Sequence, residues 1–137
     1  MTGDVVSHIL KVCTQVHNLW NSLDHFVDYS HNVNEMRVLK PSRIRSFARD
    51  FPSAETPLLA WLKQARLARW QSIRDVRATY PHADAVRVGS GREVTVFNVH
   101  GGNYRLIVAI KYRWGMVYVL RFLTHPEYDR RRWKTEL

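Results

Sequence analysis

Two adjacent glycines, Gly101 and Gly102, separate two segments in which apolar and polar residues alternate, and this pattern constrains the fold more than any other part of the sequence. A Gly-Gly pair between such segments is typical of a two-residue β-hairpin turn, because both central residues of the favoured turn take positive φ angles. We therefore predict an antiparallel pair of strands over residues 92–99 and 104–112.

The hairpin assigns its side chains to two faces of a sheet. With the glycines as the loop, Val99 pairs with Tyr104 and Asn98 with Arg105, and successive side chains point to opposite sides. The apolar face, where helices are expected to pack, carries Phe97, Val99, Tyr104, Leu106, Val108 and Ile110. The other face carries Asn98, Arg105, Ile107, Ala109 and Lys111.

A third strand is expected over residues 116–124, and its register against the hairpin decides where the polar groups meet. A three-residue loop at 113–115 puts Arg105, Arg121 and His125 on one face, whereas a two-residue loop puts them on opposite faces, because a one-residue slip inverts a strand. We predict the three-residue loop, since it brings the cationic and proton-transferring groups together.

Helices are expected before the hairpin. A short strand over 37–40 precedes a helix over 41–50, and Thr56 is the expected N-cap of a longer helical stretch that reaches Tyr80. The apolar pattern drifts near 68–70, so one helix and two helices with a bend both fit. The predicted fold is α+β, a small antiparallel sheet with helices packed on one face.

The charge of the 137 residues is uneven. The formal net charge is +9, yet residues 1–35 hold one basic residue against four acidic ones, and residues 36–137 hold 20 against 8. Such a basic segment suggests a polyanionic partner, of which nucleic acid is the commonest. The longest apolar run is too short to cross a membrane, the start lacks a signal-peptide pattern, and the lone Cys13 excludes an intrachain disulfide. We expect a cytoplasmic protein with no membrane partner.

The first segment has apolar residues at helical spacing. They are Val5, Ile9, Val12, Val16, Leu19, Leu23 and Phe26. We predict a helical extension over 1–35 that lies on the basic domain over 36–137. Two alternatives fit the same residues: this helix pairs with another helix or covers the basic face, or the functional chain starts at Met36.

Four residues of the hairpin, the third strand and the segment that follows it suggest RNA cleavage. Arg105 and Arg121 supply fixed cations for a phosphate, while His125 and Tyr128 supply groups able to move a proton. RNA carries its own nucleophile, the 2′-hydroxyl, so such a site needs no metal, and the sequence has no carboxylate cluster for Mg²⁺. We therefore expect no cofactor and no metal.

Several segments closely resemble the HigB family of bacterial toxins, within the RelE-like mRNA interferases. The most specific are Val96–Ile110, with Phe-Asn-Val-His-Gly-Gly-Asn-Tyr-Arg, and Val119–Asp129, with Thr-His-Pro-Glu-Tyr-Asp. Ala60-Trp61, Trp70 and the Tyr-Pro-His-Ala-Asp run at 80–84 match as well.

The resemblance covers Met36 to about Asp129 and leaves residues 1–35 outside. It implies a compact RelE-like fold and a toxin of a type II toxin–antitoxin system. It also implies an endoribonuclease that inhibits translation by cleaving mRNA on the ribosome, and a cognate antitoxin, usually a helix-turn-helix protein.

Carried onto this sequence, the resemblance assigns residues to a catalytic set and an RNA-binding set. In the catalytic set, Arg105 and Arg121 bind the scissile phosphate and His125 transfers a proton, while Tyr128 stacks on a base or hydrogen-bonds near the 2′-hydroxyl. The resemblance places Asn98 and Asn103 in the RNA-binding set. Charge, and not the resemblance, adds Lys111, Arg130, Arg131 and Lys134 to it, and a solvated surface is the alternative for Lys111 and Lys134. The run at 130–134 is more basic than the family leads us to expect, and we expect it to bind ribosomal RNA. Asn98 and Asn103 also fit a role in supporting the turn. A non-catalytic RNA- or ribosome-binding module and an antitoxin-binding module are the alternative functions.

Overall fold

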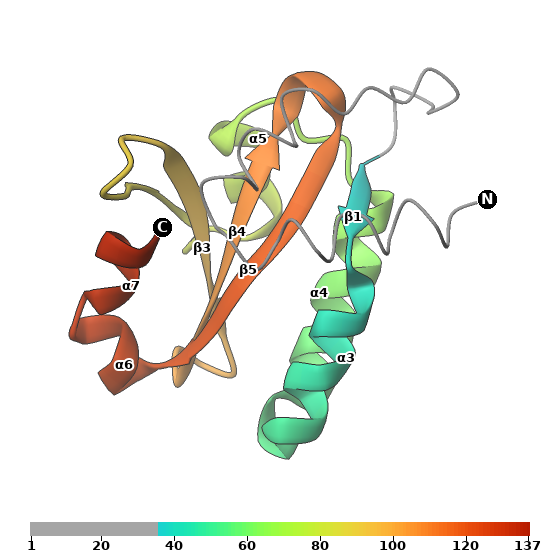
Figure 1. Cartoon of the computed structure of the whole chain (residues 1–137). Helices are drawn as coiled ribbons and strands as arrows, with labels where there is room; N and C mark the ends of the chain where they lie inside the picture. Colours follow the sequence, from blue (N-terminus) through green and yellow to red (C-terminus); the bar gives the residue numbers. More distant parts are fainter. Residues whose placement is uncertain (1–35) are drawn as a thin grey trace.

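The computed structural model describes residues 36–137, which form a five-stranded sheet with helices on both sides (Figure 1). The strands are β1 (Arg37–Leu39), β2 (Asp84–Arg87), β3 (Glu93–Val99), β4 (Tyr104–Lys111) and β5 (Met116–Thr124). The helices are α3 (Pro41–Asp50), α4 (Glu55–Leu67), α5 (Ile73–Thr79), α6 (His125–Asp129) and α7 (Arg132–Glu136), with short 3-10 turns at Pro52–Ala54 and Tyr112–Trp114. The expected helix over 1–35 lies outside the described residues.

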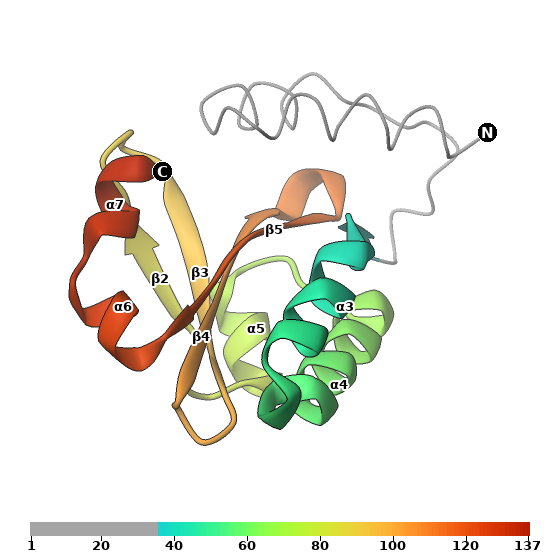
Figure 2. The same ribbon diagram turned by 60° about the horizontal axis from the view of Figure 1, so that its bottom comes forward.

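The strand order is β1-β5-β4-β3-β2, in which β1 runs parallel to β5 and the other pairs are antiparallel. Helices α3, α4 and α5 lie on one side of the sheet, and α6 and α7 lie on the other (Figure 2). The α+β fold is confirmed. The edge strand β2, which pairs with β3, was not predicted. Among residues 36–137, no helix is long and apolar enough to cross a membrane.

The hairpin between β3 and β4 has the predicted register. Val99 pairs with Tyr104 and Asn98 with Arg105. The turn is closed by a 3.2 Å hydrogen bond that the Asn103 amide donates to the His100 carbonyl. The φ angles of the two central glycines are 64° and 90°, in the region that a residue with a Cβ atom rarely adopts. Local turn chemistry therefore sets the register of the whole hairpin.

The predicted three-residue loop between β4 and β5 is wrong. Lys111 pairs with Met116, so four residues connect the strands. A four-residue connection alone would place Arg105 and Arg121 on opposite faces. A β-bulge between the Val108–Val119 and Ile107–Arg121 pairs shifts the register by one residue. The bulge, and not the loop, therefore puts both arginines on one face.

The helical stretch differs from the prediction at its start. Thr56 is not the N-cap: α4 begins at Glu55 and its N-cap is Ala54. The 3-10 turn ends at Ala54, which is fully buried, and leads directly into the helix, so the helical geometry starts before Thr56 is reached. The stretch is two helices, because the chain is extended at Ala68, where its carbonyl accepts a 3.2 Å hydrogen bond from the Met36 amide.

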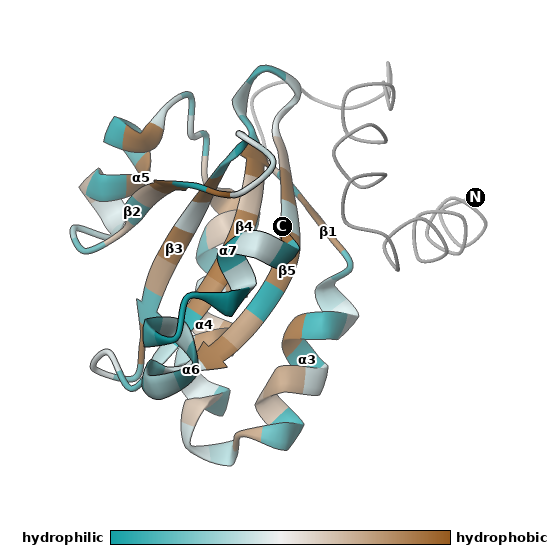
Figure 3. Cartoon of the chain, turned by 60° about the vertical axis from the view of Figure 1, so that its left-hand side comes forward, coloured by the Kyte–Doolittle hydropathy of each residue, from teal (hydrophilic) through white to brown (hydrophobic). Residues whose placement is uncertain are grey.

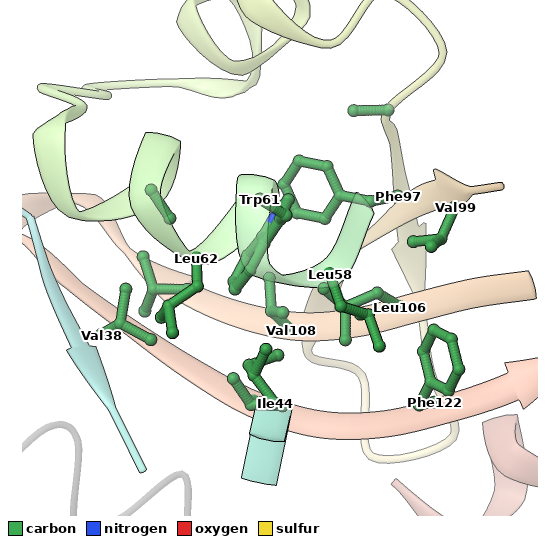
Figure 4. Packing of buried hydrophobic residues seen from close by; sticks show 14 of the residues in the cluster. Val38, Ile44, Leu58, Trp61, Leu62, Phe97, Val99, Leu106, Val108 and Phe122 are labelled. Carbon is green, nitrogen blue, oxygen red and sulfur yellow. The ribbon is translucent and has the colours of Figure 1, made fainter. Parts of the chain in front are cut away.

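The main core lies between α3–α5 and the sheet. Figure 4 shows Leu58, Trp61 and Leu62 of α4 packed against the strands. The face predicted to be apolar supplies the strand side of this core, with Phe97, Val99, Leu106 and Val108 buried and Tyr104 and Ile110 packed at its margin. The prediction of this face is confirmed.

A second, smaller core covers part of the opposite face. It holds residues of β3–β5 together with two C-terminal side chains: Val94, Val96, Ile107, Ala109, Tyr118, Leu120, Trp133 and Leu137. Figure 3 shows α6 and α7 lying over these strands, joined by a hydrophilic segment. The C-terminal helices therefore share the face that carries Arg105 and Arg121.

Candidate active site

The two arginines of the predicted site are diagonal neighbours on the face that α6 and α7 partly cover. Arg105 pairs with Leu123, and Arg121 pairs with Ile107. Residues related in this way across an antiparallel pair have Cα atoms about 7–8 Å apart. Neither arginine is sealed in the interior, since both are of intermediate exposure. The two arginine side chains therefore start from neighbouring positions on one face of the sheet.

Backbone carbonyls hold both guanidinium groups. Nη1 of Arg105 donates to the carbonyls of Gly102, in the hairpin turn, and Tyr104. Nη1 of Arg121 donates to the carbonyl of Leu120, the residue inserted by the bulge, at 3.1 Å. Nη2 of Arg121 lies 3.9 Å from a carboxylate oxygen of Glu136 in α7. These contacts orient the groups while using only part of the donor capacity of each guanidinium.

The Thr-His-Pro-Glu-Tyr-Asp motif forms the junction of β5 and α6. Thr124 is the N-cap, and its hydroxyl oxygen accepts the Glu127 amide at 3.4 Å. The Glu127 carboxylate accepts the Thr124 amide at 3.2 Å, which completes a capping box. Pro126 fits the first helical turn, where no amide donor is required. Thr124 and Glu127 therefore start the helix that presents the remaining residues of the motif.

His125 is exposed at the start of α6. Its amide donates to the carbonyl of Asn103 at 2.9 Å, which ties α6 to the β3–β4 turn. Its Nδ1 lies 3.0 Å from a carboxylate oxygen of Asp129, four residues later, and the two side chains are 51% and 59% exposed. A carboxylate at Nδ1 favours the form of imidazole that keeps a proton there and leaves Nε2 available. Asp129 thus orients the ring of His125.

Tyr128 links Arg105 to the C-terminal helix. The guanidinium carbon of Arg105 lies 5.4 Å from the centroid of the Tyr128 ring. The same ring stacks on Trp133, with a centroid distance of 5.1 Å and an interplanar angle of 20°. Burial raises the pKa of Tyr128 above its ordinary value of 10.0, and the opposing effect of Arg105 is smaller. The phenol is therefore protonated at neutral pH and can donate a hydrogen bond.

The residues of the predicted RNA-binding set are placed differently from one another. Asn98 is exposed beside Arg105, and Asn103 lies in the turn, where its carbonyl holds His125. Lys111 lies at the opposite end of β4 from Arg105, about 20 Å along the strand. The structure therefore separates Lys111 from the other predicted residues.

The cations of the C-terminal segment lie next to the site. Arg130 and Arg131 are exposed between α6 and α7. Lys134 has its ammonium nitrogen 5.6 Å from the Trp133 ring centroid. All three cations follow Tyr128 within six residues, and the charge of Arg131 acts on the Tyr128 phenol.

Sequence reasoning missed three residues that contact the predicted set: Asp129, Trp133 and Glu136. For Asp129 a signal was available, because His125 and Asp129 have the i, i+4 spacing that brings side chains together on a helix. Trp133 and Glu136 gave no such signal, since their contacts depend on how α7 folds back. Within residues 36–137, no group of three or more His, Cys, Asp or Glu side chains is arranged to hold a metal ion.

Taken together, the arrangement has the parts that phosphodiester chemistry requires. It offers two oriented cations on one face of a small mixed sheet, a protonated phenol against one of them, and an exposed imidazole with a carboxylate partner on the same short helix as the phenol. They define a small, basic α+β protein with a candidate phosphodiester-binding site.

The comparison with protein families agrees with this class. The model of the HigB toxin family, the RelE-like toxic component of a toxin–antitoxin system, matches residues 54–131, more than half of the chain. The chain belongs to this family, and an antitoxin is its implied partner. The matched residues run from the start of α4 past the end of α6, so β1, α3 and α7 lie outside them. A comparison with the curated proteins found no match.

Proposed function

We propose that this toxin is an endoribonuclease that cleaves mRNA on the ribosome by attack of the RNA's own 2′-hydroxyl, without a metal ion. The proposal is supported by three features: Arg105 and Arg121 share one partly exposed face of the sheet, the Tyr128 ring lies against Arg105, and His125 is exposed on the same helix as Tyr128. Membership of the HigB toxin family and the net charge of +9 support the same substrate class.

In the proposed reaction the 2′-oxygen attacks phosphorus and the bond to the 5′-oxygen breaks. A base takes the proton of the 2′-hydroxyl, and an acid gives a proton to the departing 5′-oxygen. The products are a 2′,3′-cyclic phosphate on the upstream fragment and a free 5′-hydroxyl on the downstream one. Arg105 and Arg121 stabilise the doubly charged phosphorane, which carries more negative charge than the substrate.

His125 and Tyr128 perform the two proton transfers between them. The Nε2 atom of His125 is assigned one of these transfers, because an imidazole nitrogen can act as a general acid or a general base and Nδ1 already faces Asp129. Tyr128 is protonated in this range and supplies a hydrogen-bond donor. Its ring already contacts Arg105 and Trp133, which favours a role for its hydroxyl over stacking on a base.

The basic segment after α6 binds RNA outside the scissile phosphate. Arg130, Arg131 and Lys134 are close in sequence to Tyr128, and Arg130 and Arg131 are exposed. We assign them to backbone phosphates of mRNA or ribosomal RNA. Asn98, beside Arg105, contacts the RNA at the margin of the site. Lys111 lies too far from the site to take part in cleavage.

The test uses the full chain with a translated reporter transcript on ribosomes, in the presence of a chelator. We expect fragments with 5′-hydroxyl and 2′,3′-cyclic phosphate ends. His125→Ala and Arg121→Ala should each lower the cleavage rate by about 100-fold or more. Arg45→Ala is the matched control, because it removes one exposed cation from α3, on the other side of the sheet, and should leave the rate within about twofold.

The same variants separate the alternative functions. Growth arrest that persists in His125→Ala and Arg121→Ala with intact mRNA would indicate a non-catalytic ribosome-binding module. No arrest, combined with tight binding to the product of the neighbouring gene, would indicate a module that mainly binds its antitoxin. Cleavage that requires added Mg²⁺ would contradict the metal-independent mechanism.

The antitoxin is proposed to be a helix-turn-helix protein encoded next to the toxin, acting in the cytoplasm. A net positive surface favours an acidic segment of that partner over the site. Co-expression of the neighbouring gene should restore growth and yield a stable complex. Loss of toxicity without complex formation would contradict this assignment.

A further inference from the structure

The C-terminal helix α7 lies outside the family match, yet it contacts the proposed site directly. Its Trp133 is 2% exposed and stacks on the ring of Tyr128. The indole nitrogen also donates a 3.0 Å hydrogen bond to the Tyr128 carbonyl. One side chain therefore restrains both the ring and the backbone of Tyr128.

Helix α7 is itself anchored to the sheet. The amide of Gly89, in the β2–β3 loop, donates a 2.7 Å hydrogen bond to the Lys134 carbonyl. The approach is close, since a Cβ atom on Gly89 would lie 2.9 Å from that oxygen. Leu137, at the end of the chain, is 4% exposed in the same apolar cluster as Trp133. The residues on both sides of Trp133 are thus anchored, so the indole keeps a fixed position against Tyr128.

The turn between α6 and α7, which brings Trp133 against Tyr128, has an unfavourable backbone conformation. Arg131 has a φ angle of 62°, in the left-handed region that an arginine rarely adopts. This conformation reverses the chain so that Trp133 returns to the residue five positions before it. The surrounding contacts therefore outweigh the local cost of the turn.

From these contacts we infer that Trp133 is a positioning residue for cleavage. It holds the Tyr128 phenol beside Arg105, at the place where the hydroxyl meets the reacting phosphate. The inference rests on the proposed nuclease function and extends it, because it gives α7 a part in the chemistry. Without the indole the phenol ring would keep its contact with Arg105 but lose its second support, and fewer molecules would hold the reactive arrangement.

The experiment compares three variants of the full chain with the wild type in the ribosome-bound reporter assay, measuring kcat and KM separately. Trp133→Leu should lower kcat by about tenfold and leave KM within about twofold, because RNA binding depends on the arginines. Trp133→Phe keeps an aromatic ring on Tyr128 and should restore kcat to within about threefold of the wild type. Val76→Ala is the stability control, since Val76 is a fully buried residue of α5, on the other side of the sheet.

Two comparisons decide the inference. Val76→Ala should lower the thermal midpoint without changing kcat for the folded protein, so an equal fall in kcat would mean that Trp133 only stabilises the fold. Trp133→Leu should add little to the loss caused by Tyr128→Phe, because both act through one phenol. Additive losses, or a Trp133→Phe variant as slow as Trp133→Leu, would overturn the inference.

The outcomes also separate this inference from the proposed function. A wild-type chain that cleaves no transcript overturns both. A wild-type chain that cleaves, with Trp133→Leu at the wild-type kcat, overturns the positioning role alone.

Discussion

The contact between Asp129 and His125 gives the sharpest prediction about the site. Asp129→Ala removes the carboxylate that lies 3.0 Å from Nδ1 of His125. The change should lower the cleavage rate because the imidazole loses the partner that fixes its orientation and its protonated nitrogen. His125 would keep its place on α6, since its amide is bound by Asn103.

The expected magnitudes follow from exposure. Both side chains of the pair are more than half exposed, at 51% and 59%, so the pair contributes at most about 1 kcal/mol to folding. The thermal midpoint of Asp129→Ala should therefore fall by only a few degrees. The effect on catalysis should be larger than the effect on folding, because an imidazole without its partner spends less time in the reactive orientation. We expect kcat to fall about tenfold, equivalent to about 1.4 kcal/mol.

A double-mutant cycle measures whether Asp129 acts through His125. Asp129→Ala should lower kcat about tenfold in the wild type and have no effect on the residual activity of His125→Ala. Asp50→Ala is the matched control, because it also removes one exposed carboxylate, at the end of α3 on the other layer. It reports any change that comes only from the higher net charge.

The reasoning would be refuted if Asp129→Ala lowered kcat equally in both backgrounds, because the carboxylate would then act on something other than the imidazole. It would also be refuted if Asp129→Ala and Asp50→Ala had the same effect. In that case the overall charge, and not the orientation of the ring, would control the rate.

Three further predictions concern charge and pH. Glu136→Gln removes the carboxylate that competes with phosphate for a guanidinium of β5, so it should tighten RNA binding by about two- to threefold in a salt titration. Arg131→Gly relieves a positive φ, so it should raise the free energy of unfolding by about 0.5–1 kcal/mol in denaturant titrations. The same change should reduce the salt slope of RNA binding by about one. Burial raises the pKa of Tyr80, Tyr112 and Tyr128 above 10.0. The contribution of these three tyrosines to folding stability is therefore complete below pH 10. It is lost above pH 10, because the tyrosines of the unfolded chain ionise first. A thermal midpoint that did not fall when the pH rose past 10 would contradict this expectation.

The hairpin could be predicted from the sequence because its determinants are local. Gly101 and Gly102 dictate a turn of positive φ, and the alternation on either side then assigns every residue of both strands to a face. The sequence did not decide between one helix and two helices with a break near Ala68. The break depends on a hydrogen bond from Met36, a residue far away in the chain. The start of α4 was predicted at the wrong residue because the preceding 3-10 turn, and not the capping chemistry of Thr56, sets where the helix begins.

The site shows the same division between local and non-local determinants. The capping residues and the catalytic candidates of α6 lie within six consecutive positions, so the chemistry that starts this helix is local. The contacts of Trp133 could not be predicted, because they require the chain to reverse at Arg131 and dock under the β2–β3 loop. Arg121 was correctly predicted to share a face with Arg105, but the prediction rested on a three-residue loop that the structure does not have.

The β-bulge in β5, which the sequence analysis did not predict, joins the core to the site. The inserted residue, Leu120, is 1% exposed and belongs to the smaller apolar cluster, while the next residue, Arg121, pairs on the same face beside Ile107. The Leu120 carbonyl accepts hydrogen bonds from Arg121 and, at 3.0 Å, from Arg43 of α3. Leu120 thus fills the smaller core, and its carbonyl orients Arg121, the proposed phosphate-binding group, and links it to the helical layer. A regular ladder with the same four-residue connection would turn Arg121 toward the main core, so the proposed site depends on this bulge.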